Sequence, residues 1–115
     1  MLNAVEALEY DFAEKFTKNP GLRFKKLSEF SGEEFRENVL EPFFKENKKI
    51  IINLEGIESA LGASFLSEAF GNLAVKYGLD KFNEIIQIST DDKIGKVTND
   101  EMIKRVKEAL NRQSN

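Results

Sequence analysis

The chain has 115 residues, of which 41% are apolar and 32% are charged, and its formal net charge is −3. This length suffices for one compact domain, and the composition is typical of a globular protein rather than a disordered one. The negative charge argues against a large nucleic-acid interface, while the lack of Cys and His excludes disulfides, thiol chemistry and the commonest zinc ligands.

The N-terminal segment, MLNAVEALEYD, is acidic and too poor in apolar residues for a signal peptide. No apolar run approaches the roughly 20 residues that a membrane-crossing helix needs, so we expect a cytoplasmic protein without membrane contacts. Residues 2–12 fit both a helix and a strand, and we favour a strand because the sheet needs more members than its two obvious ones. A helical turn at 13–16 and a turn at 19–21 follow.

The next part of the chain predicts an edge segment and a helix. Residues 22–30 alternate weakly between apolar and polar side chains, which is typical of an edge strand. Ser31 and Glu34 have the spacing of a capping box, so we expect the helix to begin at Ser31. Pro42 interrupts its apolar stripe, which predicts a kink or a restart, and the cations after Asn47 favour its end.

A run of three isoleucines marks the strand expected at about residues 49–54. Such a run predicts an inner strand of a parallel sheet that is covered on both faces. A loop of small residues follows, and residues 64–77 then carry the clearest helical repeat in the chain, with Gly78 as its left-handed cap. Function in open α/β sheets usually lies at the carboxyl ends of strands, so the loop at 55–64 is the candidate functional region.

The remaining residues predict one more strand and one more helix. The strand is expected at 82–90, where isoleucines cluster, with a turn at 90–93. Thr98 and Glu101 have capping-box spacing, so the last helix is expected to begin at Thr98. The predicted fold class is therefore α/β, with one small domain over residues 1–115, a mixed or mostly parallel sheet of about four strands, and three or four helices.

Four stretches, in order, resemble an uncharacterised bacterial and phage family of STAS-like domains. They are PGLRF (20–24), FSGEEFRENVLEP (30–42), IINLEGIES (51–59) and GASFLSEAFGNL (62–73). The resemblance covers about residues 20–89 and implies a small α/β domain without a known enzymatic activity. STAS domains are the fold of anti-sigma factor antagonists, in which a partner kinase, a GHKL-type ATPase, phosphorylates a Ser or Thr at the start of the helix after the central strand.

Carried over by matching GASF, that role falls to Ser64, with Ser59 as a second candidate. The Asp-Ser-Ser-Gly run of the antagonists is absent, and residues 61–64, Leu-Gly-Ala-Ser, stand near its place. A competing interpretation from the residues alone makes Ser64 the N-cap of the helix, with Gly62 giving the loop its backbone freedom. The loop that we expect to contact a protein partner contains Glu58, Ser59, Ala60, Leu61, Gly62, Ala63 and Ser64.

The sequence and the resemblance together predict a non-catalytic regulatory or protein-interaction module. One alternative is a structural adaptor of a bacterial or phage defence or conflict system. Another is a small-molecule binder or an enzyme at the same loop, where Glu55 and Glu58 could form an acid/base pair but no complete catalytic set is visible. We expect no cofactor, no metal and no nucleic-acid partner.

Arg23 directly follows the turn at 19–21 and has two interpretations. It binds an anion or a partner carboxylate, or it pairs within the chain with Glu33, Glu34 or Glu68 and locks the turn against a helix. The internal pair predicts that loss of Arg23 lowers stability and not only partner affinity.

Overall fold

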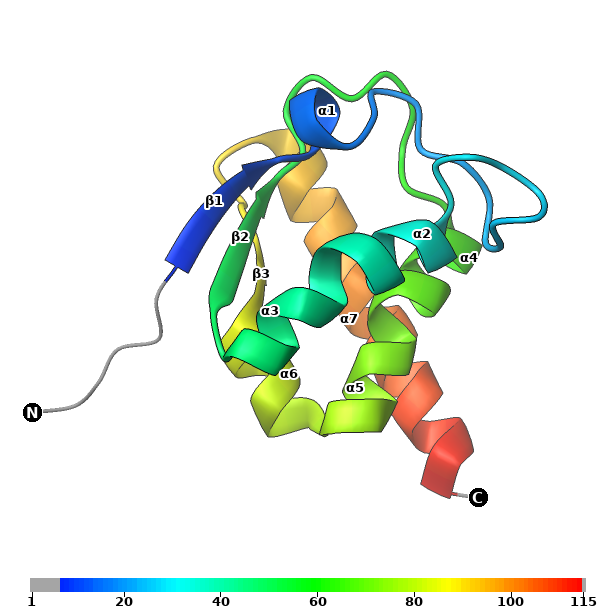
Figure 1. The fold of residues 1–115 in the computed structure, drawn as a ribbon, viewed down its shortest axis with the longest axis vertical. Coiled ribbons are helices and arrows are strands. Elements are labelled where there is room, and N and C mark those ends of the chain that lie inside the picture. Colours follow the sequence, from blue (N-terminus) through cyan, green and yellow to red (C-terminus); the bar gives the residue numbers. More distant parts are fainter. Residues whose placement is uncertain (1–6, 115) are drawn as a thin grey trace, which may run out of the picture.

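The computed structural model describes residues 7–114, whose helices pack on a three-stranded parallel sheet with the strand order β1-β2-β3 (Figure 1). The strands are β1 (Ala7–Asp11), β2 (Lys49–Asn53) and β3 (Ile86–Ile88). The central strand β2 pairs in parallel with both neighbours, so the isoleucine run does form an inner strand. The α/β class and the parallel sheet are confirmed, with three strands in place of about four.

The sheet buries one face and leaves the other partly open. Ile50 and Ile52 of β2 are 0% and 1% exposed, whereas Ile51 between them is only half-buried. In the sheet register Ile51 lies between Glu9 of β1 and Gln87 of β3, both of which are exposed. The prediction that the isoleucine run is covered on both faces is therefore wrong, because polar neighbours line the second face.

The N-terminal strand leads directly into a short helix. Asp11 ends β1 and caps α1 (Phe12–Lys15), where its Oδ1 accepts a hydrogen bond from the backbone amide of Glu14 at 3.2 Å. This turn places Phe12 in the core with 0% exposure. The strand prediction and the helical turn are thus confirmed from Ala7 onward, and the part of the prediction that concerns residues 2–6 lies outside the described residues.

Residues 22–30 do not form an edge strand. The backbone amide of Gly21 donates to the carbonyl oxygen of Phe30 at 2.8 Å, which closes this segment into a loop. The hydroxyl of Ser28 accepts from the backbone amide of Leu22 at 2.7 Å. The loop therefore uses for itself the backbone groups that a strand offers to a sheet, which explains why the predicted fourth strand is missing.

The helix that follows Ser31 changes its winding before Pro42. It consists of α2 (Gly32–Glu34), the π-helical segment η1 (Phe35–Leu40) and α3 (Glu41–Glu46). The Oγ of Ser31 accepts from the amide of Glu34 at 3.0 Å, so the predicted cap is confirmed. In η1 the amide of Glu41 donates to the carbonyl of Arg36, five residues earlier. The expected restart at Pro42 thus takes the form of a wide turn that ends just before the proline.

A second continuous helix follows the loop after β2 and also contains a π-helical segment. Its parts are α4 (Ala63–Leu66), η2 (Ser67–Gly71) and α5 (Asn72–Tyr77). Gly78 ends it with a φ of 91°, a positive value as the sequence predicts. A further helix, α6 (Leu79–Ile85), occupies the first half of the segment predicted as strand 82–90. Phe82 and Ile85 are buried on the inner side of this helix. The strand begins only after the helix ends, at Ile86.

The last helix, α7 (Lys93–Ser114), begins earlier than predicted. The Oδ2 of Asp92 accepts from the backbone amide of Gly95 at 3.2 Å, so Asp92 and not Thr98 caps this end. Thr98 lies inside the helix and is 6% exposed. The capping-box prediction at Thr98 is therefore wrong, although the turn predicted at 90–93 does precede the helix.

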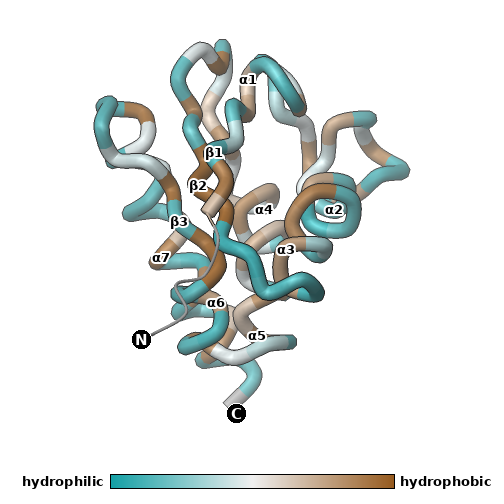
Figure 2. Tube along the Cα trace, turned by 60° about the vertical axis from the view of Figure 1, so that its left-hand side comes forward, coloured by the Kyte–Doolittle hydropathy of each residue, from teal (hydrophilic) through white to brown (hydrophobic). Residues whose placement is uncertain are grey.

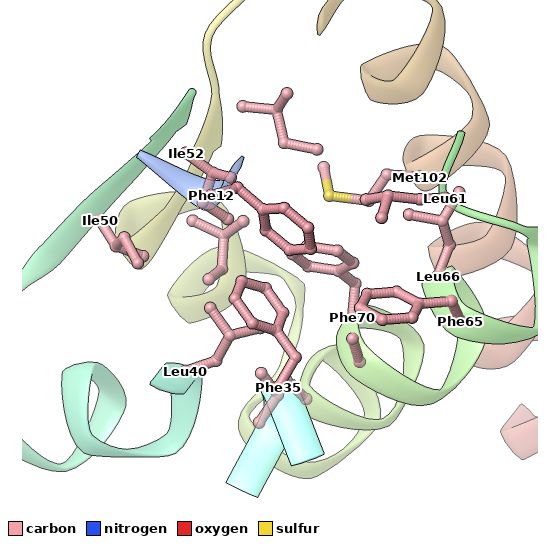
Figure 3. Close-up of a cluster of buried hydrophobic side chains, with 14 of the residues drawn as sticks. Phe12, Phe35, Leu40, Ile50, Ile52, Leu61, Phe65, Leu66, Phe70 and Met102 are labelled. Carbon is pink, nitrogen blue, oxygen red and sulfur yellow. The ribbon is translucent and has the colours of Figure 1, made fainter. Parts of the chain in front are cut away.

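Aromatic rings from several elements meet in one core beneath the sheet (Figure 3). The ring of Phe35 in η1 lies 5.0 Å from that of Phe12, 6.0 Å from that of Phe65 in α4 and 6.2 Å from that of Phe70 in η2, measured between centroids. Figure 2 shows apolar residues concentrated along β2, whereas the helices alternate between apolar and hydrophilic residues. Within residues 7–114, no helix combines the length and apolar character needed to cross a bilayer.

Candidate functional site

The loop after β2 is fixed against the segment that follows α1, and Figure 1 shows the two running side by side. The backbone amide of Glu58 donates to the carbonyl oxygen of Lys18 at 2.7 Å, and its carboxylate accepts from the side chain of Asn19 at 3.3 Å. Ile57 and Leu61 point inward and are 8% and 7% exposed. The loop is therefore held in place by hydrogen bonds to the neighbouring segment and by the burial of its two large apolar side chains.

Most of the predicted partner-binding loop does lie at the surface. Glu58, Ser59, Ala60, Gly62, Ala63 and Ser64 are exposed. The prediction for Leu61 is wrong, because its side chain turns into the core beside the labelled aromatic residues of Figure 3. Burial of Leu61 holds the loop down and leaves only small and polar side chains for a partner to contact.

Ser64 is not the N-cap of the helix. Gly62 occupies the cap position of α4 and makes no side-chain cap hydrogen bond, so Ser64 is the second residue of the helix. Gly62 has an ordinary φ of −74°, and the glycine with a positive φ in this loop is Gly56, at 97°. Both structural roles expected here, a cap at Ser64 and backbone freedom at Gly62, are therefore wrong. Ser64 is left as an exposed hydroxyl in the first helical turn.

Arg23 lies next to Ser64. Its Nε is 3.4 Å from the carbonyl oxygen of Ser64, to which it donates, and 3.9 Å from Oε1 of Glu68. The second carboxylate oxygen of Glu68 accepts from Nη2 of Arg36 at 2.9 Å. Of the internal partners considered for Arg23, the structure thus supplies Glu68. This group joins the loop after residue 21 to the helix that carries Ser64.

The loop between Gly21 and Phe30, called the apolar loop below, was not recognised from the sequence as a surface. Its four large apolar side chains are exposed: Leu22 and Leu27 by 57% each, Phe24 by 39% and Phe30 by 38%. Figure 1 shows the loop projecting from the body of the molecule above α2 and α4. The only sequence signal was weak apolar alternation, which also fits a strand.

An ion pair fixes the tip of the apolar loop to η1. The ammonium of Lys25 lies against the carboxylate of Glu37, and the backbone amide of Lys25 donates to the carboxylate of Glu33 at 2.9 Å. The hydrogen bond with Glu37 raises the pKa of Lys25, and the same bond lowers the pKa of Glu37. Polar contacts therefore tie the apolar loop to α2 and η1, while its large apolar side chains are exposed.

The other candidate groups do not converge on a site. Glu55 and Glu58 are both exposed, and within the described part of the chain no three His, Cys, Asp or Glu residues are placed to hold a metal ion.

Comparison with known proteins gives one family. A family model described as a STAS-like domain of unknown function matches residues 31–96, which is more than half of the chain. The matched region runs from the cap at Ser31 through β2, the following loop, α4 and β3 into the first turn of α7. No curated protein and no solved structure matches the chain.

Proposed function

The chain belongs to this family of STAS-like domains, and we propose that it is a non-catalytic module that docks on a protein partner. Its docking surface consists of the apolar loop and the exposed start of α4 around Ser64. The observation that carries the proposal is the exposure of Leu22, Phe24, Leu27 and Phe30 in one projecting loop. Exposed apolar side chains that gather in one loop of a folded protein are a common feature of interaction sites.

The hydrogen bonds within the apolar loop support a binding role. The bonds from Gly21 to Phe30 and from Leu22 to Ser28 hold its backbone before any partner arrives. A loop that is already ordered loses less conformational entropy on binding than a loose one. Aromatic anchors such as Phe24 are also the kind of side chain that dominates the energy of protein interfaces.

A switch at Ser64 is supported by the exposure of this residue and by the family resemblance. A phosphate there adds nearly two negative charges, beside the guanidinium of Arg23, whose Nε lies 3.4 Å from the carbonyl oxygen of Ser64. Binding of the phosphate draws Arg23 away from Glu68 and shifts the base of the apolar loop. Ser59 is exposed on the same surface, but Arg23 contacts Ser64, so we assign the switch to Ser64.

The docking surface is tested by affinity capture from native host cells with the tagged full-length chain. Leu27→Ser removes an exposed apolar side chain from the loop, and Val97→Ser is its matched control, because Leu27 and Val97 are 57% and 56% exposed. We expect the main captured protein to be retained by Val97→Ser and lost from Leu27→Ser. Equal capture by both variants would refute docking through the apolar loop.

The switch is tested separately by intact-mass measurement. The chain is incubated with ATP and the captured partner, or with a GHKL-type ATPase from the same host. We expect wild type to gain the mass of one phosphate, Ser59→Ala to gain it as well, and Ser64→Ala to gain none. A phosphate on Ser59 alone, or none in any form, would remove the switch while leaving the docking surface intact.

A further inference from the structure

The outer edge of β1 carries no neighbouring strand among the described residues. All five residues of β1 pair with β2 on one side, in the register from Ala7 with Lys49 to Asp11 with Asn53. An unpaired strand edge presents a row of backbone donors and acceptors that can bind another extended chain. This edge faces away from the apolar loop, on the other side of the molecule (Figure 1).

The apolar layer beneath the sheet extends beyond β1. Leu8 shares the covered face with its register neighbour Ile50 and, one strand further, with Ile86. Ile50 and Ile86 are 0% and 5% exposed, but Leu8 is 47% exposed. The side chains that cover the two isoleucines therefore do not extend far enough to cover Leu8.

A hollow lies beside the exposed side chain of Leu8. It has a volume of about 460 Å³, lies between β1 and α3, and is lined by the apolar residues Ala7, Leu8, Pro42 and Phe43 and by the ion pair of Glu46 and Lys48. One strand is about 4.8 Å from the next in a sheet. A strand added beside β1 would place every second side chain over this hollow, where apolar residues gain contact with Leu8 and Phe43.

The opposite face of the added strand would meet acidic side chains. Glu9 is exposed on the open face of β1, and Asp11 follows it on the same face. Directly opposed side chains on neighbouring strands lie about 5 Å apart, so Lys or Arg beside Glu9 is favourable and a carboxylate is not. A second copy of β1 fits less well, because in-register parallel pairing and antiparallel pairing centred on Glu9 both place Glu9 against Glu9 of the other copy.

From these observations we propose that β1 accepts an extended segment of a partner protein as a fourth strand of the sheet. The segment has apolar side chains at alternate positions, which fill the hollow, and basic side chains between them, which lie beside Glu9. Backbone hydrogen bonds supply affinity in this binding mode, and the alternating side chains supply specificity. The proposal does not depend on the function assigned to the apolar loop.

The proposal is tested by selecting binders for the immobilised full-length chain from a phage-displayed library of random linear peptides. We expect the enriched peptides to alternate apolar residues with Lys or Arg. In titrations with such a peptide, Leu8→Lys should weaken binding about tenfold or more, since a charge then faces the hollow. Leu79→Lys is the matched control with unchanged affinity, because Leu79 is 43% exposed on α6.

Two further measurements make the test specific. When the Glu9→Lys variant is the immobilised target, the selected peptides should carry Asp or Glu at the positions where wild type enriches Lys or Arg. Hydrogen exchange should slow at β1 amides when the peptide binds, and Leu27→Ser in the apolar loop should leave the affinity unchanged. No enrichment, protection elsewhere, or a dimer in ultracentrifugation that Leu8→Lys dissociates would each overturn the proposal, and the last would assign the edge to a second copy.

Discussion

The Nε of Arg23 lies 3.4 Å from the carbonyl oxygen of Ser64, so one side chain joins the apolar loop to the first turn of α4. The same nitrogen is 3.9 Å from Glu68, whose carboxylate also binds Arg36. These contacts connect the two parts of the proposed docking surface, the apolar loop and the start of α4. A change at Ser64 can therefore reach the apolar loop through a single guanidinium.

The first prediction concerns this link. Arg23→Ala should loosen the base of the apolar loop while lowering the free energy of unfolding by less than about 1 kcal/mol, because the Arg23 side chain is 38% exposed and its pair with Glu68 is screened by water. Hydrogen-exchange mass spectrometry should show faster exchange in residues 21–30 and unchanged exchange in β2. Unaltered exchange in the loop would show that other contacts hold it.

The second prediction concerns a buried carboxylate between two helices. Glu41 of α3 is 7% exposed and accepts hydrogen bonds from the hydroxyl of Tyr77 at 2.7 Å and from Nζ of Lys76 at 3.0 Å. Tyr77→Phe leaves this carboxylate with one donor fewer and should cost about 1–2 kcal/mol in urea unfolding at pH 7. Lys76→Met should cost less, because the Lys76 side chain is 57% exposed.

The cost of Tyr77→Phe should depend on pH. Burial opposes ionisation of Glu41, but the hydrogen bonds from Tyr77 and Lys76 outweigh it and lower its pKa below the usual 4.5. A carboxyl with a lowered pKa stabilises the folded state fully above its unfolded pKa and loses this contribution as the pH falls through the folded pKa. The gap between wild type and Tyr77→Phe should therefore be constant near neutral pH and shrink below 4.5. A gap independent of pH would contradict this assignment.

The third prediction compares two glycines near the docking surface. A Cβ at Gly32 would lie 2.8 Å from the backbone carbonyl oxygen of Phe65, whereas a Cβ at Gly62 meets no atom within 4 Å. Gly32→Ala should force α2 away from α4 and cost about 1–3 kcal/mol. Gly62→Ala, at the cap position of α4 with an ordinary φ of −74°, should cost less than about 1 kcal/mol, because the lower entropy of the unfolded chain offsets part of the poorer helix cap. Equal effects would mean that the two helices pack less closely than described.

The sequence predicted those elements whose signals are local. The isoleucine run predicted β2, the spacing of Ser31 and Glu34 predicted the helix cap, and Gly78 predicted the end of a helix, and the structure contains all three. At the candidate site, the exposure of Ser64 agrees with the expected position of its loop at the carboxyl end of a strand, and Glu68 was one of three internal partners considered for Arg23.

The remaining elements depend on contacts that spacing does not encode. Residues 22–30 alternate like a strand, but the Ser28 hydroxyl and the Phe30 carbonyl bind amides of the same segment. Leu61 has small neighbours in the sequence, yet the fold carries it into the core. The early start of α7 had no apolar stripe to mark it, because the buried positions of its first turns are Gly95 and Thr98, whereas Ile94 and Val97 are exposed.

Photocrosslinking at single positions of the apolar loop is the sharpest test of docking through this loop. A photoreactive phenylalanine analogue replaces Phe24 in one form of the chain and Ile94 of α7 in the other, since both side chains are 39% exposed. In native host cells we predict a light-dependent adduct with one partner protein from position 24 and none from position 94. Adducts of equal yield from both positions, or an adduct from position 94 alone, would contradict docking through the apolar loop.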